Sequence, residues 1–291
     1  MRRISQLSAL CLAAAALSAC KQDEVVATEN VPTAGVRFIN AVPDTGGSAG
    51  LDMRFVDIVE NNAQFKVPFR NNIATSGGVA ASTMIEYKNT RAGQRHFRIF
   101  LSDTLQAVAQ TVLKDTTVTI EAGKNYTIML WGNARAGQAP AMRLTFMQDA
   151  PPDPGSQVAL RVINTTGSSI DARQYLSTGT VPGAATWANV APLSSSSYVN
   201  VAPGQYRFNV QPAGGGTSLF SDALALPGAA ATVDVEALPG TTIAGSAVTA
   251  IVWPRSVAGS KAPQTGTPSF AAPSVSFVWD RRPPRSCSPL C

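Results

Sequence analysis

The chain has 291 residues, of which 14% are charged, and its formal net charge is +5 at pH 7. The positive charge lies at the two ends, because residues 20–254 carry 16 basic and 17 acidic side chains, a net charge of about −1. A nearly neutral body excludes a surface that tracks the phosphates of a nucleic acid. The many small, hydroxyl and β-branched residues favour sheets over amphipathic helices, so an all-β fold is expected.

Residues 1–19 have the layout of a secretory signal peptide. Two arginines precede an apolar run from Leu7 to Leu17, which is shorter than the roughly 20 apolar residues that cross a bilayer. The run ends at Leu17-Ser18-Ala19-Cys20, which resembles the bacterial lipobox. This resemblance implies cleavage before Cys20 and attachment of acyl chains such as palmitate at that residue. The alternative is an ordinary secreted protein with a chance cysteine after its cleavage site.

The segment from Cys20 to residue 33 is polar and has no strand periodicity, as expected of a flexible tether. Lys21 stands where an aspartate would resemble the inner-membrane retention signal of diderm bacteria. We therefore expect a cell-envelope protein that is anchored to a membrane through Cys20. The outer membrane is favoured, with the body facing the periplasm or the cell surface.

Two stretches of the chain occur twice. Val36-Arg37-Phe38-Ile39-Asn40 returns as Leu160-Arg161-Val162-Ile163-Asn164, and the stretch from Tyr87 to Gln94 resembles that from Tyr198 to Gln205. A spacing of roughly 110–125 residues is too long for a solenoid repeat and fits a small domain. The repeat predicts two tandem domains, at residues 34–149 and 156–254, with a Pro-rich hinge at 150–155.

The first domain alternates apolar and polar residues in short runs separated by turn residues. In the run 51–55, for example, Leu51, Met53 and Phe55 share one face of the expected strand. The other expected strands are 36–39, 87–101, 108–113, 116–120, 126–132 and 144–147, with loops and an edge strand between 61 and 82. Turns about every ten residues predict that each domain is an antiparallel β-sandwich of the immunoglobulin-like or Greek-key kind.

These residues also resemble a known family, the domain of unknown function 4397 (DUF4397). The family's opening strand, its S-P-D-like turn and its V-D-V-Y-V-like strand are similar to 36–39, 42–44 and 51–55 here. Its Y-x-x-x-x-x-G-x-Y/R and A-G-x-x-Y-T strands are similar to 87–97 and 122–127. Where the family commonly has a histidine after the first strand, this chain has Asn40 and Asn164, so no role of that histidine carries over. The resemblance implies a β-sandwich in exported or surface proteins and no particular activity.

The second domain is a diverged copy of the first. Ile170 to Arg173 corresponds to Leu51 to Arg54, and Val233 to Ala237 corresponds to Val118 to Ala122. Trp131 and Trp253 also correspond, each after an apolar run. We interpret the two tryptophans as equivalent structural residues on the inner face.

Residues 255–291 are rich in Pro and Ser and are expected to form a loose tail. One run, 274–279, has strand alternation and could dock on the second domain. Cys287 and Cys291 lie four residues apart in a chain that is expected to be exported. They either form a disulfide within the tail or remain free for intermolecular pairing.

Catalytic and metal-binding sets are not apparent. His96 is the only histidine and lies in mid-strand, with no G-x-S-x-G motif in the chain, so a Ser-His-Asp triad is not expected. One histidine, with no cysteine in the body beyond Cys20, does not suffice for a zinc site. Asp44 and Asp52 lack the D-x-D-x-D pattern of a calcium loop and are interpreted as solvated turn residues. We expect no cofactor and no metal.

One pair of charges occurs in both domains. Asp52 and Arg54 return as Asp171 and Arg173, each pair two residues apart on one strand face. Each pair is either a structural ion pair or a spot for binding a ligand, and the structural interpretation is favoured.

The leading functional hypothesis is a non-enzymatic, lipid-anchored envelope protein. Its tandem sandwiches would bind an envelope protein or a glycan, or act as a structural or adhesive spacer. The alternative is a carbohydrate-active or other hydrolytic enzyme that uses carboxylates from opposed loops.

Overall fold

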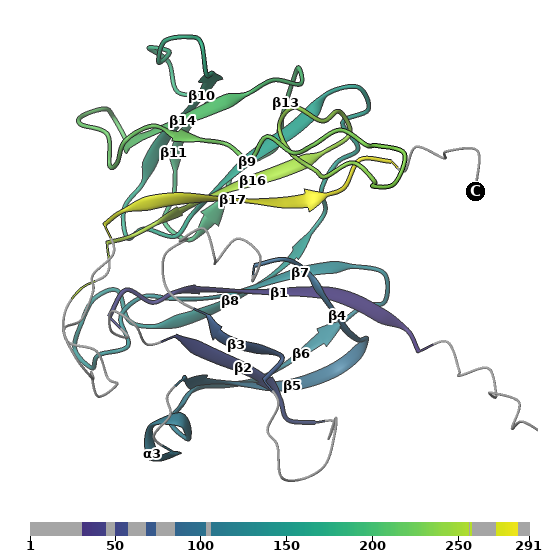
Figure 1. The fold of residues 1–291 in the computed structure, drawn as a ribbon. Helices are drawn as coiled ribbons and strands as arrows, with labels where there is room; N and C mark the ends of the chain where they lie inside the picture. The colour runs from purple at the N-terminus through teal and green to yellow at the C-terminus, as the bar shows by residue number, and fades with distance from the viewer. Residues whose placement is uncertain are drawn as a thin grey trace, which may run out of the picture. The chain divides into compact units, whose positions relative to one another are not determined.

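The computed structural model describes residues 31–44, 50–57, 68–73, 85–102, 106–255, 257 and 272–284. The described residues from Thr33 onward belong to one compact unit. Their regular structure is almost entirely β-strand (Figure 1), which confirms the all-β prediction. In the described parts of the chain, no helix is long and apolar enough to cross a membrane.

The first half of this unit, residues 33–149, has two four-stranded sheets, an outer sheet in the order β3-β2-β5-β6 and an inner sheet in the order β4-β1-β7-β8. Their strands are β1 (Thr33–Ala41), β2 (Leu51–Phe55), β3 (Arg70–Ile73), β4 (Lys88–Arg91), β5 (Gly93–Leu101), β6 (Val112–Ile120), β7 (Asn125–Trp131) and β8 (Arg143–Asp149). Phe38 and Ile128 of the inner sheet pack against Leu51 and Phe97 of the outer sheet. This burial of alternate residues from both sheets is the core of a β-sandwich.

The expected strand at 108–113 is wrong in part. A short helix, α3 (Gln106–Ala109), comes first, and β6 then runs without a break from Val112 to Ile120. Gln and Ala are good helix formers, and the alternation in this run is too short to outweigh them.

The second half, residues 156–284, has the same strand order. Its outer sheet is β11-β10-β14-β15 and its inner sheet is β12-β9-β16-β17, with β13 also paired with β9. The strands are β9 (Val158–Asn164), β10 (Ile170–Leu176), β11 (Trp187–Val190), β12 (Ser194–Ser195), β13 (Val199–Val201), β14 (Tyr206–Pro212), β15 (Ala223–Leu224), β16 (Ala247–Trp253) and β17 (Ser274–Arg281). Its own core contains Phe208 of the outer sheet together with Val162, Val248 and Val252 of the inner sheet.

The run at 274–279 is part of β17, which extends to Arg281 and pairs with β16 along its whole length. Figure 1 shows β9, β16 and β17 running side by side. The strand stands in the second inner sheet where β8 stands in the first. The segment assigned to the tail therefore supplies the last strand of this sheet.

The correspondence of Val233 to Ala237 with a strand of the first half is wrong. These residues lie in a loop that Ala229 and Leu238 close with two backbone hydrogen bonds, and the side chain of Val233 is 92% exposed. The two-residue strand β15 takes the place of β6 beside β14. An apolar alternation of four or five residues does not by itself secure a strand without a neighbour to pair with.

Each inner sheet contains one parallel pair within an otherwise antiparallel arrangement. β1 runs parallel to β7, and β9 runs parallel to β16. The residues of β9 and β16 are buried along their whole length, and those of β1 and β7 nearly so. Continuous burial means that both faces of the inner sheets are covered.

The second face of the inner sheets forms a third apolar cluster, which contains residues of both halves. Ile39, Met129 and Trp131 come from the first half, and Ile163, Ile251 and Trp253 come from the second. In β1, odd-numbered residues face this cluster and even-numbered residues face the core of the first half, as the two-residue period of a strand requires. The two inner sheets therefore pack on each other.

Candidate functional site: a buried ion network between the inner sheets

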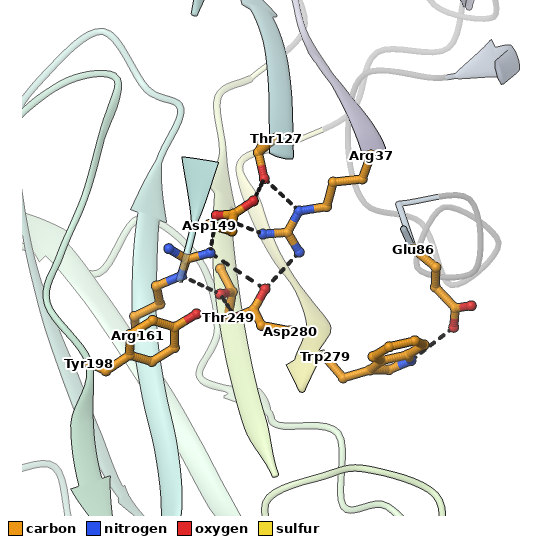
Figure 2. Close-up of polar contacts among 9 residues, drawn as sticks. All are labelled: Arg37, Glu86, Thr127, Asp149, Arg161, Tyr198, Thr249, Trp279 and Asp280. Atoms are coloured by element: carbon orange, nitrogen blue, oxygen red, sulfur yellow. Dashed lines mark hydrogen bonds and ion pairs between the residues drawn. The ribbon is translucent and has the colours of Figure 1, made fainter. Parts of the chain in front are cut away.

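Four charged residues lie in the layer between the inner sheets. Arg37, Asp149, Arg161 and Asp280 are 0%, 6%, 6% and 3% exposed. Figure 2 shows the two carboxylates between the two guanidinium groups, with Thr127 and Thr249 beside them. The formal charges cancel, which is the condition for burying ions at a tolerable cost.

The strand registers place the corresponding residues of the two halves in matching positions. Arg37 on β1 lies opposite Thr127 on β7, and Arg161 on β9 lies opposite Thr249 on β16. The Nε of each arginine donates to the threonine hydroxyl opposite it at 2.7 Å. Each hydroxyl in turn donates to the aspartate at the end of the neighbouring strand, Thr127 to Asp149 and Thr249 to Asp280.

The shortest ion pairs cross from one half to the other. Arg37 Nη1 lies 2.8 Å from Asp280 Oδ1, and Arg161 Nη2 lies 2.7 Å from Asp149 Oδ1. The pairs within each half are longer, 3.7 Å from Arg37 to Asp149 and 3.5 Å from Arg161 to Asp280. Ion pairs of the network therefore connect the two halves in the same layer in which the third apolar cluster connects them by packing.

Two tyrosines cover the guanidinium groups. Arg37 lies 4.6 Å from the ring centre of Tyr87, and Arg161 lies 4.7 Å from that of Tyr198. The Tyr198 hydroxyl donates to Asp280 at 2.8 Å. At the edge of the network, Trp279 Nε1 donates to Glu86 Oε1 at 2.9 Å, a further contact between the halves (Figure 2).

The electrostatics keep these groups in one charge state. Burial acts to raise the pKa of Asp149, but the charges of Arg37 and Arg161 and the hydrogen bonds from Thr127 and Arg161 outweigh it, so the pKa is lowered. Burial acts to lower the pKa of Arg37, but the negative charges around it, that of Asp280 above all, outweigh burial. The pKa of Arg37 is therefore raised. Burial, followed by the charge of Asp280, raises the pKa of Tyr198. Such groups hold a fixed structure and do not exchange protons near neutral pH.

The predicted lipidation and disulfide residues Cys20, Cys287 and Cys291 lie outside the described residues. His96 lies on the partly exposed face of β5, where its Nε2 contacts Asp115, and Asp115 also accepts from Arg98 Nε at 2.7 Å. No group of three or more metal-ligand side chains occurs in the part of the chain that the structure describes.

The interpretation of Asp44 and Asp52 as solvated turn residues is wrong, because both side chains are buried. Asp44 accepts from the backbone N–H groups of Ala134 at 2.6 Å and Arg135 at 3.0 Å, and Asp52 accepts from that of Asn72 at 2.9 Å. They close loops of the first half by satisfying backbone donors that burial would otherwise leave unpaired.

The two expected Asp–Arg pairs differ from each other. Arg54 Nη2 lies 2.8 Å from Asp52 Oδ2. Asp171 instead accepts from the backbone N–H groups of Asn189 at 2.7 Å and Gly214 at 3.1 Å, and Arg173 forms no ion pair within the described residues. The structural interpretation holds for the first pair only.

Trp131 and Trp253 are both buried, at 3% and 1% exposure. They correspond in position, but they belong to the third cluster and face the other half, not the interior of their own sandwich. Trp253 Nε1 donates to Ser276 Oγ at 2.9 Å on β17.

Sequence reasoning missed the ion network. The signal for it was an arginine in the middle of each of the two repeated apolar strands, because a buried cation requires a counter-ion. The two aspartates have no such signal, since each stands near the end of a strand in a polar context that does not distinguish it from an exposed residue.

Residues 34–173 match the model of a family described as "Domain of unknown function (DUF4397)". The match covers the whole first half and continues through β9 into β10, so that it includes Arg37, Thr127, Asp149 and Arg161 of the network. The comparison with curated proteins found no match.

Proposed function

We propose that this chain is a lipid-anchored protein of the cell envelope, built from two tandem copies of the DUF4397-like domain, with a non-enzymatic binding or structural role. The Leu17-Ser18-Ala19-Cys20 sequence after a signal-peptide-like run supports the anchor. The polar residues that follow support a tether between the lipid and the β-sandwiches.

The observation that supports a non-enzymatic role is that the buried carboxylates are all bonded within the protein. Asp44, Asp52, Asp149, Asp171 and Asp280 are the buried acidic residues of the described chain, and each is bonded to backbone N–H groups or arginines of the protein itself. A hydrolase that works with carboxylates, such as a glycosidase, needs at least one carboxyl group that is free to reach the substrate. Here the buried acids are committed to holding the fold.

The anchor is tested by replacing Cys20. We expect wild-type protein to incorporate a palmitate label and to fractionate with membranes, and Cys20→Ala to lose both properties. Cys11→Ala is the matched control, since Cys11 lies within the same leader and should leave labelling and fractionation unchanged. Membrane retention of the unlabelled Cys20→Ala protein would refute the anchor. Density separation of the two membranes of a diderm host then tests the preference for the outer membrane.

The non-enzymatic role is tested with the purified protein on a panel of glycans, esters and peptides. We expect no turnover above that of a heat-denatured control. Turnover that disappears on replacing an exposed acid such as Asp57 or Asp153 with asparagine would establish the hydrolase instead.

A further inference from the structure

The two outer sheets differ at the edge that β6 forms in the first half and β15 forms in the second. In the second half this edge is short and covered. β15 has two residues, and Leu226 and Pro227, which follow it, accept backbone hydrogen bonds from Thr241 and Thr242 at 2.8 and 3.0 Å. β6 has nine residues, and no described backbone group outside β5 bonds to them. Alternate residues of β6 therefore direct N–H and C=O groups away from the sheet, without a partner in the described chain.

The other edge strands of the outer sheets are protected against further pairing, and most of β6 is not. β3 and β11 are each four residues long and contain an asparagine with positive φ, Asn72 and Asn189. Short strands, irregular backbone and charges are the usual features that keep an edge from pairing. In β6 the charges are confined to Lys114 and Asp115, and the run 116–120 that follows has five β-branched residues. Such a run has a high propensity to pair with a further strand.

The charges on β6 are compatible with a second copy of the same strand. Two identical strands pair antiparallel about a twofold axis that passes through one residue, because side chains directly opposite each other lie on the same face of the sheet. An axis at Asp115 sets that carboxylate against its own copy, and an axis at Val118 sets it against Glu121. An axis at Thr117 sets it against Thr119, which is neutral. Like charges directly opposite each other destabilise a strand pair, so the axis at Thr117 is favoured over the other two.

The axis at Thr117 also gives favourable contacts across the strand pair. Thr117 and Thr119 are exposed, and facing threonines stabilise paired strands. Asp115 accepts from Arg98 Nε at 2.7 Å on its own sheet, and the Thr119 hydroxyl of the second copy is placed to donate to the same carboxylate. An axis at Thr116 would instead bring the two Asp115 carboxylates to diagonal positions about 7–8 Å apart. The axis at Thr117 therefore keeps the acids apart and gives each a further donor.

We propose that this chain forms a dimer in which β6 pairs antiparallel with β6 of a second copy, with Thr117 opposite Thr117. The four-stranded outer sheets of the two first halves then form one continuous sheet. Main-chain hydrogen bonds supply most of the affinity, as they do where a strand adds to a sheet edge. One pair of strands is a small interface, so monomer and dimer are in equilibrium. This dimer is a property beyond the function proposed above, and it does not depend on the lipid anchor.

Sedimentation velocity tests the dimer with the chain from residue 20 onward, which contains the whole compact unit. Alanine replaces Cys20, Cys287 and Cys291, so that neither acyl chains nor disulfides hold copies together. We expect the apparent mass to rise from monomer to dimer with concentration. Thr117→Lys sets two cations against each other and should weaken the dimer at least about tenfold, with an unchanged Tm because the position is exposed. Thr178→Lys, at an exposed threonine of the second half, is the matched control and should leave the dimer unchanged.

A single new cysteine tests the register of the two strands. Directly opposite residues of an antiparallel pair have Cα atoms about 4.5–5.5 Å apart, within the range that a disulfide spans. In the same cysteine-free chain, Thr117→Cys should therefore form a disulfide between two copies under mild oxidation. Thr119→Cys should not, because the two copies of that residue lie about 14 Å apart along the strands.

Three results would refute the dimer. In the first, the parent chain stays monomeric up to its solubility limit. In the second, Thr117→Lys dimerises as the parent does. In the third, Thr119→Cys forms the disulfide as readily as Thr117→Cys. If Thr117→Lys has a lowered Tm, the two cysteine variants decide, since both place a small side chain at an exposed position. None of these results bears on the fractionation of Cys20→Ala.

Discussion

The inner and outer sheets of the two halves correspond to very different degrees. In the inner sheets, Arg37, Thr127, Asp149 and Tyr87 of the first half match Arg161, Thr249, Asp280 and Tyr198 of the second, with nearly equal distances. These residues meet across the layer that both halves share. Residues in contact across such a layer are energetically coupled, so a substitution in one inner sheet changes the contacts of the other. This coupling favours the same residues at matching positions in both sheets.

The outer sheets do not share that constraint. The first has the nine-residue edge strand β6, whereas the second has the two-residue β15 and a long loop in its place. Arg54 is paired with Asp52, whereas Arg173 is left without a carboxylate among the described residues. The inner sheets therefore make one body out of two sandwiches, while the outer sheets are free to take separate roles.

The largest effect is expected from removing one of the two buried carboxylates, each of which contacts both arginines. Asp280→Ala should reduce the free energy of unfolding by about 3–5 kcal/mol, because it removes the 2.8 Å partner of Arg37 and leaves two buried guanidinium groups with the single carboxylate of Asp149. Urea denaturation measures the effect. Asp153→Ala is the matched control, since the Asp153–Arg281 pair at 2.7 Å is largely exposed and should contribute about 0–1 kcal/mol. Equal losses in the two variants would contradict a stabilising network.

The apolar part of the same layer gives the second test. Trp131→Ala and Trp253→Ala should each reduce the free energy of unfolding by about 3–5 kcal/mol, as large core deletions do. Because the two rings lie in one cluster, each substitution should lower the stability of both halves. Hydrogen exchange measures this, through faster exchange of the amides of β9 and β16 in Trp131→Ala. Faster exchange that stays within the first half would show that the sandwiches are independent.

The dependence of stability on pH tests how the titratable groups of the network contribute to the fold. The lowered pKa of Asp149 means that its stabilising contribution is present above its unfolded pKa of about 3.9 and is lost as the pH falls through the folded pKa. The raised pKa values of Tyr87 and Tyr198 mean that stability is lost as the pH rises above about 10, where the unfolded tyrosines ionise. Thermal scans from pH 2 to 11 measure both limbs. In Asp149→Asn the Tm should fall less steeply as the pH is lowered. An unchanged fall of Tm at low pH would count against a contribution from Asp149.

The smallest expected effect lies at a feature that both outer sheets keep. Asn72 in β3 and Asn189 in β11 have φ values of 49° and 50°, and their N–H groups donate to Asp52 and Asp171. Asn189→Ala should cost about 1 kcal/mol, because alanine tolerates the left-handed region poorly, whereas Asn189→Gly should be nearly neutral. Melting temperatures compare the two, and the same order is expected at Asn72. A more stable alanine variant would mean that the backbone has moved.

Much of the fold could be predicted from the sequence, because alternation in β2 and β5 reports directly on one buried face. The shared layer could not. The inner strands are buried on both faces, and a strand of this kind reads as a continuous apolar run that does not say what covers its second face. Arg161 and Asp280 are 119 residues apart, and no local pattern relates them. The loop at 233–237 shows the opposite error, since it has strand alternation but no neighbouring strand with which to pair.

The place of β17 as the last of the described strands has a consequence for the order of folding. The first half can close its own sandwich once residue 149 is available, but Asp280 and the second inner sheet follow it along the chain and are synthesised later. Until then Ile39, Met129 and Trp131 present an uncovered apolar face beside an Arg37 that lacks Asp280, its nearest carboxylate. Contacts between distant parts of a chain form slowly, and exposed sheet faces in partly folded chains promote aggregation. We expect refolding from urea to pass through a species with a formed first half, detected by binding of a hydrophobic dye that is lost when β17 docks.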